Sequence, residues 1–165
     1  MSAAAVSSAA MPSSAPSART KKYPFDPVLD FMRLLWSIEH GLQRMSKKME
    51  SELGITGPQR LVLRVVGRFP GLSAGELAHI VRLHPSTITG ILQRLVARGF
   101  LERRPDPSDT RRAQLRLKPR AAVYTRSSRG TVEQVVTDAL KNVGASNVRA
   151  ARKVLAEVAE RLNDL

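Results

Sequence analysis

The pattern between residues 72 and 118 constrains most strongly what this chain can fold into. An S-x-x-E capping box at residues 73–76 marks the start of a helix. Pro85 stands where a second helix would begin, a position that tolerates its missing N–H. Gly99 follows the end of that second helix as a left-handed cap. Because only residues 82–84 separate the two helices, the pattern predicts a helix-turn-helix.

The inward face of the second helix is apolar, and its residues recur at helical spacing: Ile88, Ile91, Leu92 and Leu95. Residues 100–104 and 113–118 then read as two strands, since the later run alternates small or apolar residues with polar ones. A polar loop at residues 105–112 connects them. The expected fold class is therefore mainly α (α+β), a winged helix-turn-helix.

The outward face of the second helix carries short hydrogen-bonding groups, a glycine and one guanidinium: Ser86, Thr87, Thr89, Gly90, Gln93 and Arg94. Short donors and acceptors near a helix N-terminus can approach base edges in the major groove. The alternative is a plain solvated face, but such faces usually hold Glu and Lys, and residues 84–97 contain no acid. We therefore expect this helix to read DNA, with His84 facing phosphate at its start.

The predicted wing is strongly basic. From Arg98 to Arg120 there are eight basic and three acidic residues, a local net charge of +5. A basic hairpin tip can enter a minor groove or lie along phosphates. Arg103 and Arg112 are accordingly candidate DNA contacts.

The stretch from Thr56 to Lys118 resembles the multiple-antibiotic-resistance regulator (MarR/SlyA) family of bacterial transcription factors. The loop Pro-Asp-Pro-Ser-Asp-Thr-Arg-Arg at residues 105–112 is similar to the wing signature of that family, with its Asp-x-Arg unit. The resemblance implies that Arg111 reaches the minor groove and that Asp109 helps to hold the wing. Many members carry a basic residue where this chain has Gly90, so no base preference is carried over there.

Both ends of the folded part carry apolar residues at heptad spacing. The first series is Val28, Phe31, Leu35, Ile38, Leu42, Met45 and Met49. The second is Val148, Ala151, Leu155, Val158, Leu162 and Leu165. A small winged helix offers little surface to bury two such seams, so we expect a homodimer; the resembling family dimerises through helices from both termini. Two reading helices related by a two-fold axis imply a pseudo-palindromic operator.

The domain boundaries follow from composition. Residues 1–24 are rich in Ala, Ser and Pro and contain no acid, which predicts a disordered tail. The remainder, residues 25–165, is expected to be a single domain. The winged helix-turn-helix, called the reading head from here on, spans residues 56–118. Dimerisation helices are expected on either side of it, at residues 25–53 and 119–165.

Charge and composition exclude several classes. The net charge of +13 and the pI near 11.3 indicate a polyanionic partner. No run approaches the roughly 18 apolar residues of a membrane span, so no membrane partner is expected. The absence of cysteine excludes disulfides and thiol redox sensing. The histidines show neither a zinc spacing nor a nucleophile partner. We expect no catalytic residue, metal or cofactor, hence no enzyme, and a place in the cytoplasm with the nucleoid of a bacterium or archaeon.

A ligand site is implied by the resemblance alone. In the family a small-molecule pocket lies near the junction between the first long helix and the reading head. Trp36 and His40, four residues apart, are candidates to line it, and Arg60 and Arg64 would suit an acidic ligand. Packing of Trp36 and His40, and solvation of the arginines, are the alternative readings.

The sequence thus predicts a sequence-specific regulator of transcription that binds double-stranded DNA as a homodimer. The expected effect on transcription is repression, and an acidic or aromatic small molecule is expected to release the protein from its operator. Two alternatives stay open: a winged-helix protein-interaction module, and a sequence-independent architectural DNA binder. The acid-free helix face and the Arg-rich wing favour DNA over a protein partner.

Overall fold

The computed structural model describes residues 25–109, 111–126 and 128–163. The predicted tail at residues 1–24 lies outside the described residues. The chain divides into two compact units, and the boundary lies between Glu39 and His40. Helix α1 (Pro27–Leu53) runs through that boundary.

In the first unit, Asp26 caps the start of α1. Its Oδ1 accepts hydrogen bonds from the backbone N–H groups of Val28 (2.9 Å) and Leu29 (3.1 Å). Asp30 and Arg33 form an ion pair one turn on, at 2.6 Å. Most large apolar side chains of this segment are exposed: Val28, Leu29, Met32, Leu34, Trp36 and Ile38. Phe31 and Leu35 are half-buried, and the rest of the apolar face in the described part of this unit is exposed.

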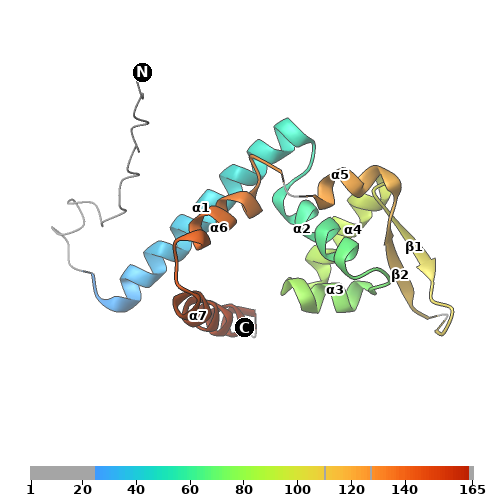
Figure 1. The fold of residues 1–165 in the computed structure, drawn as a ribbon. Helices are drawn as coiled ribbons and strands as arrows, with labels where there is room; N and C mark the ends of the chain where they lie inside the picture. Colours follow the sequence, from blue (N-terminus) through green and yellow to red (C-terminus); the bar gives the residue numbers. More distant parts are fainter. Residues whose placement is uncertain (1–24, 110, 127, 164–165) are drawn as a thin grey trace, which may run out of the picture. The chain divides into compact units, whose positions relative to one another are not determined.

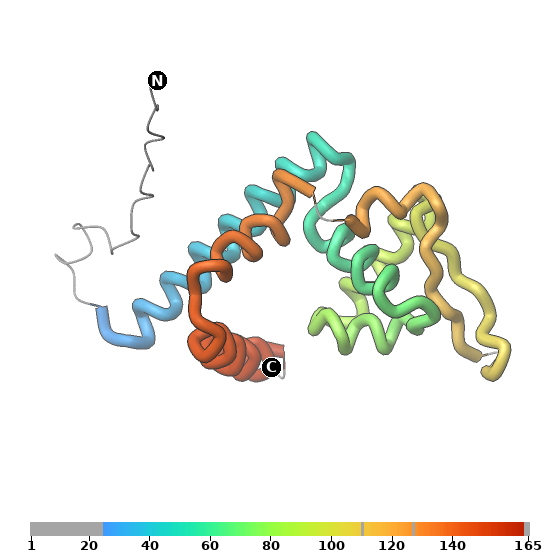
Figure 2. The backbone as a smooth tube through the Cα atoms, in the orientation of Figure 1, coloured from blue at the N-terminus to red at the C-terminus, as the bar shows by residue number. Residues whose placement is uncertain are grey.

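The second unit contains the reading head, followed by further helices (Figures 1 and 2). The head consists of α2 (Gly57–Arg68), α3 (Ala74–Val81), α4 (Pro85–Ala97), β1 (Leu101–Pro105) and β2 (Ala113–Leu117). After it come a 3-10 turn η2 (Pro119–Ala121), α5 (Ala122–Thr125), α6 (Val132–Lys141) and α7 (Ala145–Asn163). The winged helix-turn-helix expected from the sequence is confirmed.

Local sequence signals start and end the helices of the head. Thr56 and Gln59 form a reciprocal capping box on α2, and Ser73 and Glu76 form another on α3. Gly99 adopts φ +70° after α4, the left-handed conformation that glycine tolerates best.

The wing is a two-stranded antiparallel sheet in which Leu101 pairs with Leu117 and Arg103 with Leu115. Leu115 also bonds to the segment between α2 and α3: its N–H donates to the carbonyl of Leu72 (2.8 Å), and its carbonyl accepts from Gly71 (3.1 Å). These bonds tie the wing to the helices beside it.

One hydrophobic core holds the head together. Its fully buried members come from α2, α3, α4 and both strands, and include Val62, Leu63, Leu77, Ile88, Leu92, Leu95, Leu101 and Leu115. Met49 of α1 is also fully buried within its own chain, although the heptad spacing placed it in the seam between chains. The last turns of α1 lie against the start of α2, where Ser46 Oγ accepts from the Gly57 N–H at 2.9 Å.

Helices α6 and α7 contain no buried residue in the described part of the chain. Their exposed large apolar side chains are Val135, Val136, Leu140, Val143, Val154, Leu155 and Leu162. None of the described helices is long and apolar enough to cross a lipid bilayer.

Candidate nucleic-acid interface

Helix α4 is divided cleanly into an inner and an outer face. The inner side chains Ile88, Ile91, Leu92 and Leu95 are buried, as the helical spacing predicted. On the other side, Ser86, Thr87, Thr89, Gln93 and Arg94 are all exposed, and Gly90 is half-buried. The core therefore fixes α4 by one face and leaves its short polar groups exposed on the other.

Thr89 and Ser86 of this face already have polar contacts within the chain, Thr89 with Pro85 and Ser86 with His84. Thr89 Oγ1 donates to the Pro85 carbonyl at 2.9 Å, so its hydroxyl has acceptor capacity left for a partner. A Cβ built at Gly90 would lie 3.9 Å from the guanidinium of Arg94 and touch nothing closer, so the surface at Gly90 is open.

His84 is the N-cap of α4. Its Nδ1 accepts from the Ser86 N–H at 3.3 Å and lies 2.7 Å from Ser86 Oγ. Sequence reasoning placed His84 at the start of this helix but missed the cap, since histidine is not among the preferred capping residues. The ring is exposed and stands at the positive end of the helix.

The wing loop is held by two aspartates. Asp109 Oδ1 accepts from the Arg111 N–H at 3.0 Å, and its role in holding the wing stays a prediction. Asp106 accepts from Ser108 Oγ (2.6 Å) and from the Ser108 N–H (2.9 Å). These bonds, with help from Gln114, lower the pKa of Asp106 to about 2. Sequence reasoning did not single out Asp106, although the Asp-x-Ser spacing is a recognisable turn signal.

Arg111 and Arg112 have different surroundings. The Arg111 side chain is exposed and makes no ion pair or hydrogen bond within the described residues. Arg112 Nη2 lies 2.8 Å from Glu76 Oε1 on α3. The Glu76 carboxylate also accepts from Ser73, and hydrogen bonds from Ser73 and then from Arg112 lower the pKa of Glu76 to about 2. Arg111 is thus available to a partner, while Arg112 ties the wing to α3.

Arg103, the remaining wing candidate, is exposed on β1. Its neighbour Arg104 pairs instead with Glu102 at 2.6 Å. Together with Arg94 and Arg111, Arg103 supplies positive charge that the described residues do not neutralise with an ion pair.

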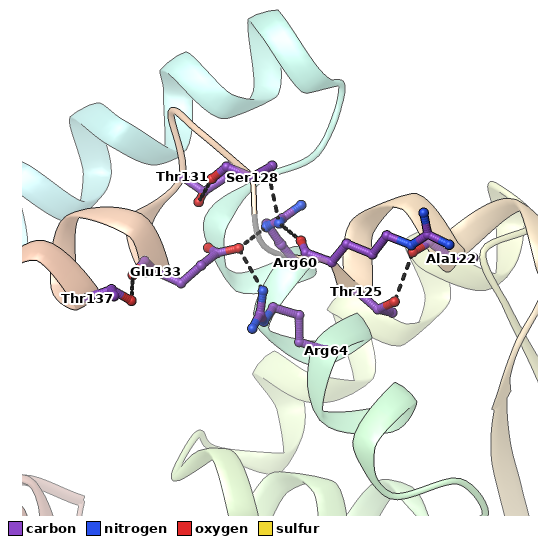
Figure 3. A network of polar contacts seen from close by, with 9 residues as sticks. Arg60, Arg64, Ala122, Thr125, Ser128, Thr131, Glu133 and Thr137 are labelled. Carbon is purple, nitrogen blue, oxygen red and sulfur yellow. Dashed lines mark hydrogen bonds and ion pairs between the residues drawn. The ribbon is translucent and has the colours of Figure 1, made fainter.

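The four candidate ligand residues lie in different settings. Trp36 is 59% exposed in the first unit, and His40 is exposed in the second. Arg60 and Arg64 both bind the Glu133 carboxylate, at 2.5 and 3.1 Å (Figure 3). Of the two alternatives for Arg60, solvation is wrong, because the side chain is buried; its role as a ligand contact stays a prediction. None of the four lines the groove between α2 and the wing or the groove between α3 and the end of α7.

Comparison with known proteins agrees with this geometry. Residues 53–112 match the sequence model of the MarR family. The winged helix-turn-helix of this chain is of the MarR family. The multiple antibiotic resistance protein MarR of Escherichia coli is 27% identical over 135 residues, covering 81% of this chain and 94% of that protein. An HTH-type transcriptional repressor of Mycobacterium tuberculosis is 27% identical over 105 residues, covering 64% of this chain and 76% of that protein.

Solved structures of MarR-family proteins have the same fold. A mutant MarR from E. coli, crystallised with operator DNA, is 26% identical with a TM-score of 0.63 and covers 79% of this chain and 94% of its own. The PcaV transcriptional regulator from Streptomyces coelicolor, in complex with its natural ligand, is also 26% identical, with a TM-score of 0.67. That match covers 83% of this chain and 96% of PcaV. The named relatives are transcriptional regulators and not enzymes.

Proposed function

We propose that this chain is a transcriptional regulator that binds duplex DNA in a sequence-specific manner, as a homodimer, and represses by occupying its operator. The observation that carries the proposal is the outer face of α4, which is exposed, free of acid and fixed from behind by a buried apolar stripe. The exposed Arg111 in the wing loop would reach the minor groove or the phosphates. The E. coli relative crystallised with operator DNA supports the same assignment.

The homodimer is proposed from apolar surface. Large apolar side chains on α1, α6 and α7 are exposed in the single chain, and exposed apolar surface of this extent marks an interaction site. A second copy would cover it through the same surface, which is how two-fold interfaces are built.

Selection of bound fragments from random duplex DNA tests the proposal. The expected result is a pair of inverted half-sites about one helical turn, ~34–36 Å, apart. A bound pool without consensus would favour an architectural binder, and no bound pool would favour a protein-interaction module.

A matched pair of variants identifies the reading face. Thr89→Ala removes a hydroxyl from the outer face of α4 and should relax preference at one base pair, a penalty of about 1–3 kcal/mol at the preferred base. Thr137→Ala is the control, because its hydroxyl makes the same contact on α6, to the Glu133 carbonyl at 2.7 Å. If both variants select the parent's consensus with equal stringency, the contact of Thr89 with a base is refuted.

We propose release by an acidic or aromatic small molecule from the family resemblance, and PcaV, which was solved with its natural ligand, supports control by a ligand. Trp36 and His40 are its candidate contacts, and Arg60 and Arg64 would first have to leave Glu133. Screening aromatic carboxylates for release of bound DNA tests this part. No release by any member of the set would remove ligand control from the proposal.

A further inference from the structure

A buried arginine connects the reading head to the segment that leads into α6. The Arg60 side chain is only 3% exposed. Its Nε donates to Glu133 Oε1 at 2.5 Å, and its Nη2 donates to the Arg126 carbonyl at 2.6 Å and to Ser128 Oγ at 3.1 Å (Figure 3). A guanidinium this deeply buried is tolerated only when its charge and its hydrogen bonds are satisfied.

The same carboxylate oxygen is held from a second direction. Arg64 Nη1 lies 3.1 Å from Glu133 Oε1, and Arg64 follows Arg60 by one helical turn of α2. Burial raises the pKa of Glu133, but hydrogen bonds from its own backbone N–H and from Arg60, with the charges of both arginines, lower it overall. The carboxylate is therefore ionised at neutral pH and is clamped between two cations.

Helix α6 has little else that attaches it to the head. It contains no buried residue in the described part of the chain, and Val135, Val136 and Leu140 are exposed. Just before the helix, Thr131 is fully buried, and its hydroxyl donates to the Ser128 carbonyl at 2.7 Å. Val132, the first residue of the helix, is half-buried, and its Cγ2 would lie 3.7 Å from a Cβ built at Gly57. The attachment of α6 is thus concentrated at its first turn, where polar contacts of Glu133 stand beside the apolar contact of Val132.

We propose that Glu133 is a positioning residue that fixes the direction in which α6 and α7 leave the reading head, and so fixes the spacing of the two heads on DNA. The consequence for spacing rests on the proposed function, because it requires the homodimer. A helix attached at one turn can rotate about that turn, and a carboxylate held by two arginines opposes that rotation. Glu133 would not touch DNA and would act on binding only through geometry.

The test compares Glu133→Gln with Asp138→Asn in the full chain. The first change keeps the shape and an acceptor oxygen but removes the charge that pairs with Arg60 and Arg64. The second is an acid-to-amide change on the same helix, where the partners of Asp138 among the described residues are Lys141 at 2.6 Å and Gln134 at 2.8 Å, both on α6. The control therefore alters α6 itself without altering its attachment to α2.

Two readouts are measured. Hydrogen exchange followed by mass spectrometry should show residues 128–141 exchanging at least about tenfold faster in Glu133→Gln, as expected for the loss of hydrogen bonds to a charged group. Residues 85–97 of Glu133→Gln should exchange at the parent's rate. Residues 128–141 of the control, Asp138→Asn, should also exchange at the parent's rate. Affinity is then compared on the selected operator and on the same operator with one base pair inserted between the half-sites. The inserted base pair should lower the DNA affinity of Glu133→Gln several-fold less than it lowers the affinity of the parent or of Asp138→Asn.

Each outcome decides a separate claim. Unchanged exchange in residues 128–141 would overturn the attachment, whether or not the chain binds DNA. In another outcome, exchange is faster in Glu133→Gln, and the inserted base pair costs this variant as much affinity as it costs the parent. That result would overturn the positioning role and leave Glu133 a purely structural one. If the parent binds no DNA, the proposed function fails while exchange still decides the attachment. If Glu133→Gln does not fold, Arg64→Gln, which removes the half-exposed partner, is judged by the same two readouts.

Discussion

Arg111 and Arg112 are neighbours in the wing loop but have different contacts. Arg111→Ala should weaken DNA binding by roughly 1–3 kcal/mol and leave the thermal melt unchanged, because the side chain has no ion pair to lose within the described residues. Arg112→Ala should lower the melting temperature as well, because it removes the partner of Glu76. Binding isotherms and melts of both variants check this. Equal affinity of Arg111→Ala and the parent would show that the wing tip does not touch DNA.

Glu76 gives a prediction for pH. Glu76→Gln keeps an oxygen for the capping box, which accepts either residue at this position, and replaces the charged oxygen that faces Arg112 with an amide NH2. The folded pKa of Glu76 is about 2, below the ordinary 4.5. A lowered pKa stabilises the fold above the unfolded value, and that contribution is lost as pH falls through the folded value. The parent's advantage over the variant should therefore be constant above about pH 4.5 and shrink toward about pH 2. Urea unfolding across this range measures it, and a pH-independent difference would contradict the assignment.

The turn between α3 and α4 is strained at one residue. Arg82 caps α3 with φ 54° and is the only residue other than glycine with positive φ in the described part of the chain. A left-handed conformation costs an L-residue roughly 1–2 kcal/mol, and glycine avoids most of that cost. The Arg82 side chain offers little in return, since it is exposed and its contact with the Ala156 carbonyl is long, at 3.4 Å.

Arg82→Gly should accordingly raise the free energy of unfolding by about 1 kcal/mol. Arg82→Ala is the matched control, because it removes the same side chain and keeps the strain, so it should not be more stable than the parent. Denaturant unfolding of the two variants gives the comparison. If Arg82→Gly and Arg82→Ala are equally stable, the left-handed backbone at residue 82 does not destabilise the fold.

At the scale of the whole molecule, the exposed apolar helices predict an oligomer. Light scattering at micromolar concentration should report about twice the chain mass of 18.1 kDa. Leu155→Asp on α7 should give a folded monomer, because Leu155 is 43% exposed in the single chain and its replacement leaves the core intact. Val123→Asp on α5, where the side chain is 65% exposed, is the control and should stay dimeric. A parent chain that scatters as a monomer would remove the homodimer from the proposed function.

The sequence by itself determined the elements of the reading head and the outer face of α4. Capping boxes, the proline at the start of α4, the glycine after it and the apolar stripe are signals among residues close in the chain, so they act before any tertiary contact exists. The Asp-x-Arg unit belongs to the same class, since Asp109 and Arg111 are two residues apart.

Only the tertiary structure decided which charged groups bind each other. Nothing local distinguishes Arg111 from Arg112, yet the fold brings Arg112 to Glu76. Arg60 and Glu133 are 73 residues apart, so their pairing depends on how α6 meets α2. The sequence pattern treated Arg60 as a surface cation because a buried arginine and an exposed one look alike in sequence. Their difference is the desolvation of the guanidinium, which depends on what surrounds the side chain in the folded molecule.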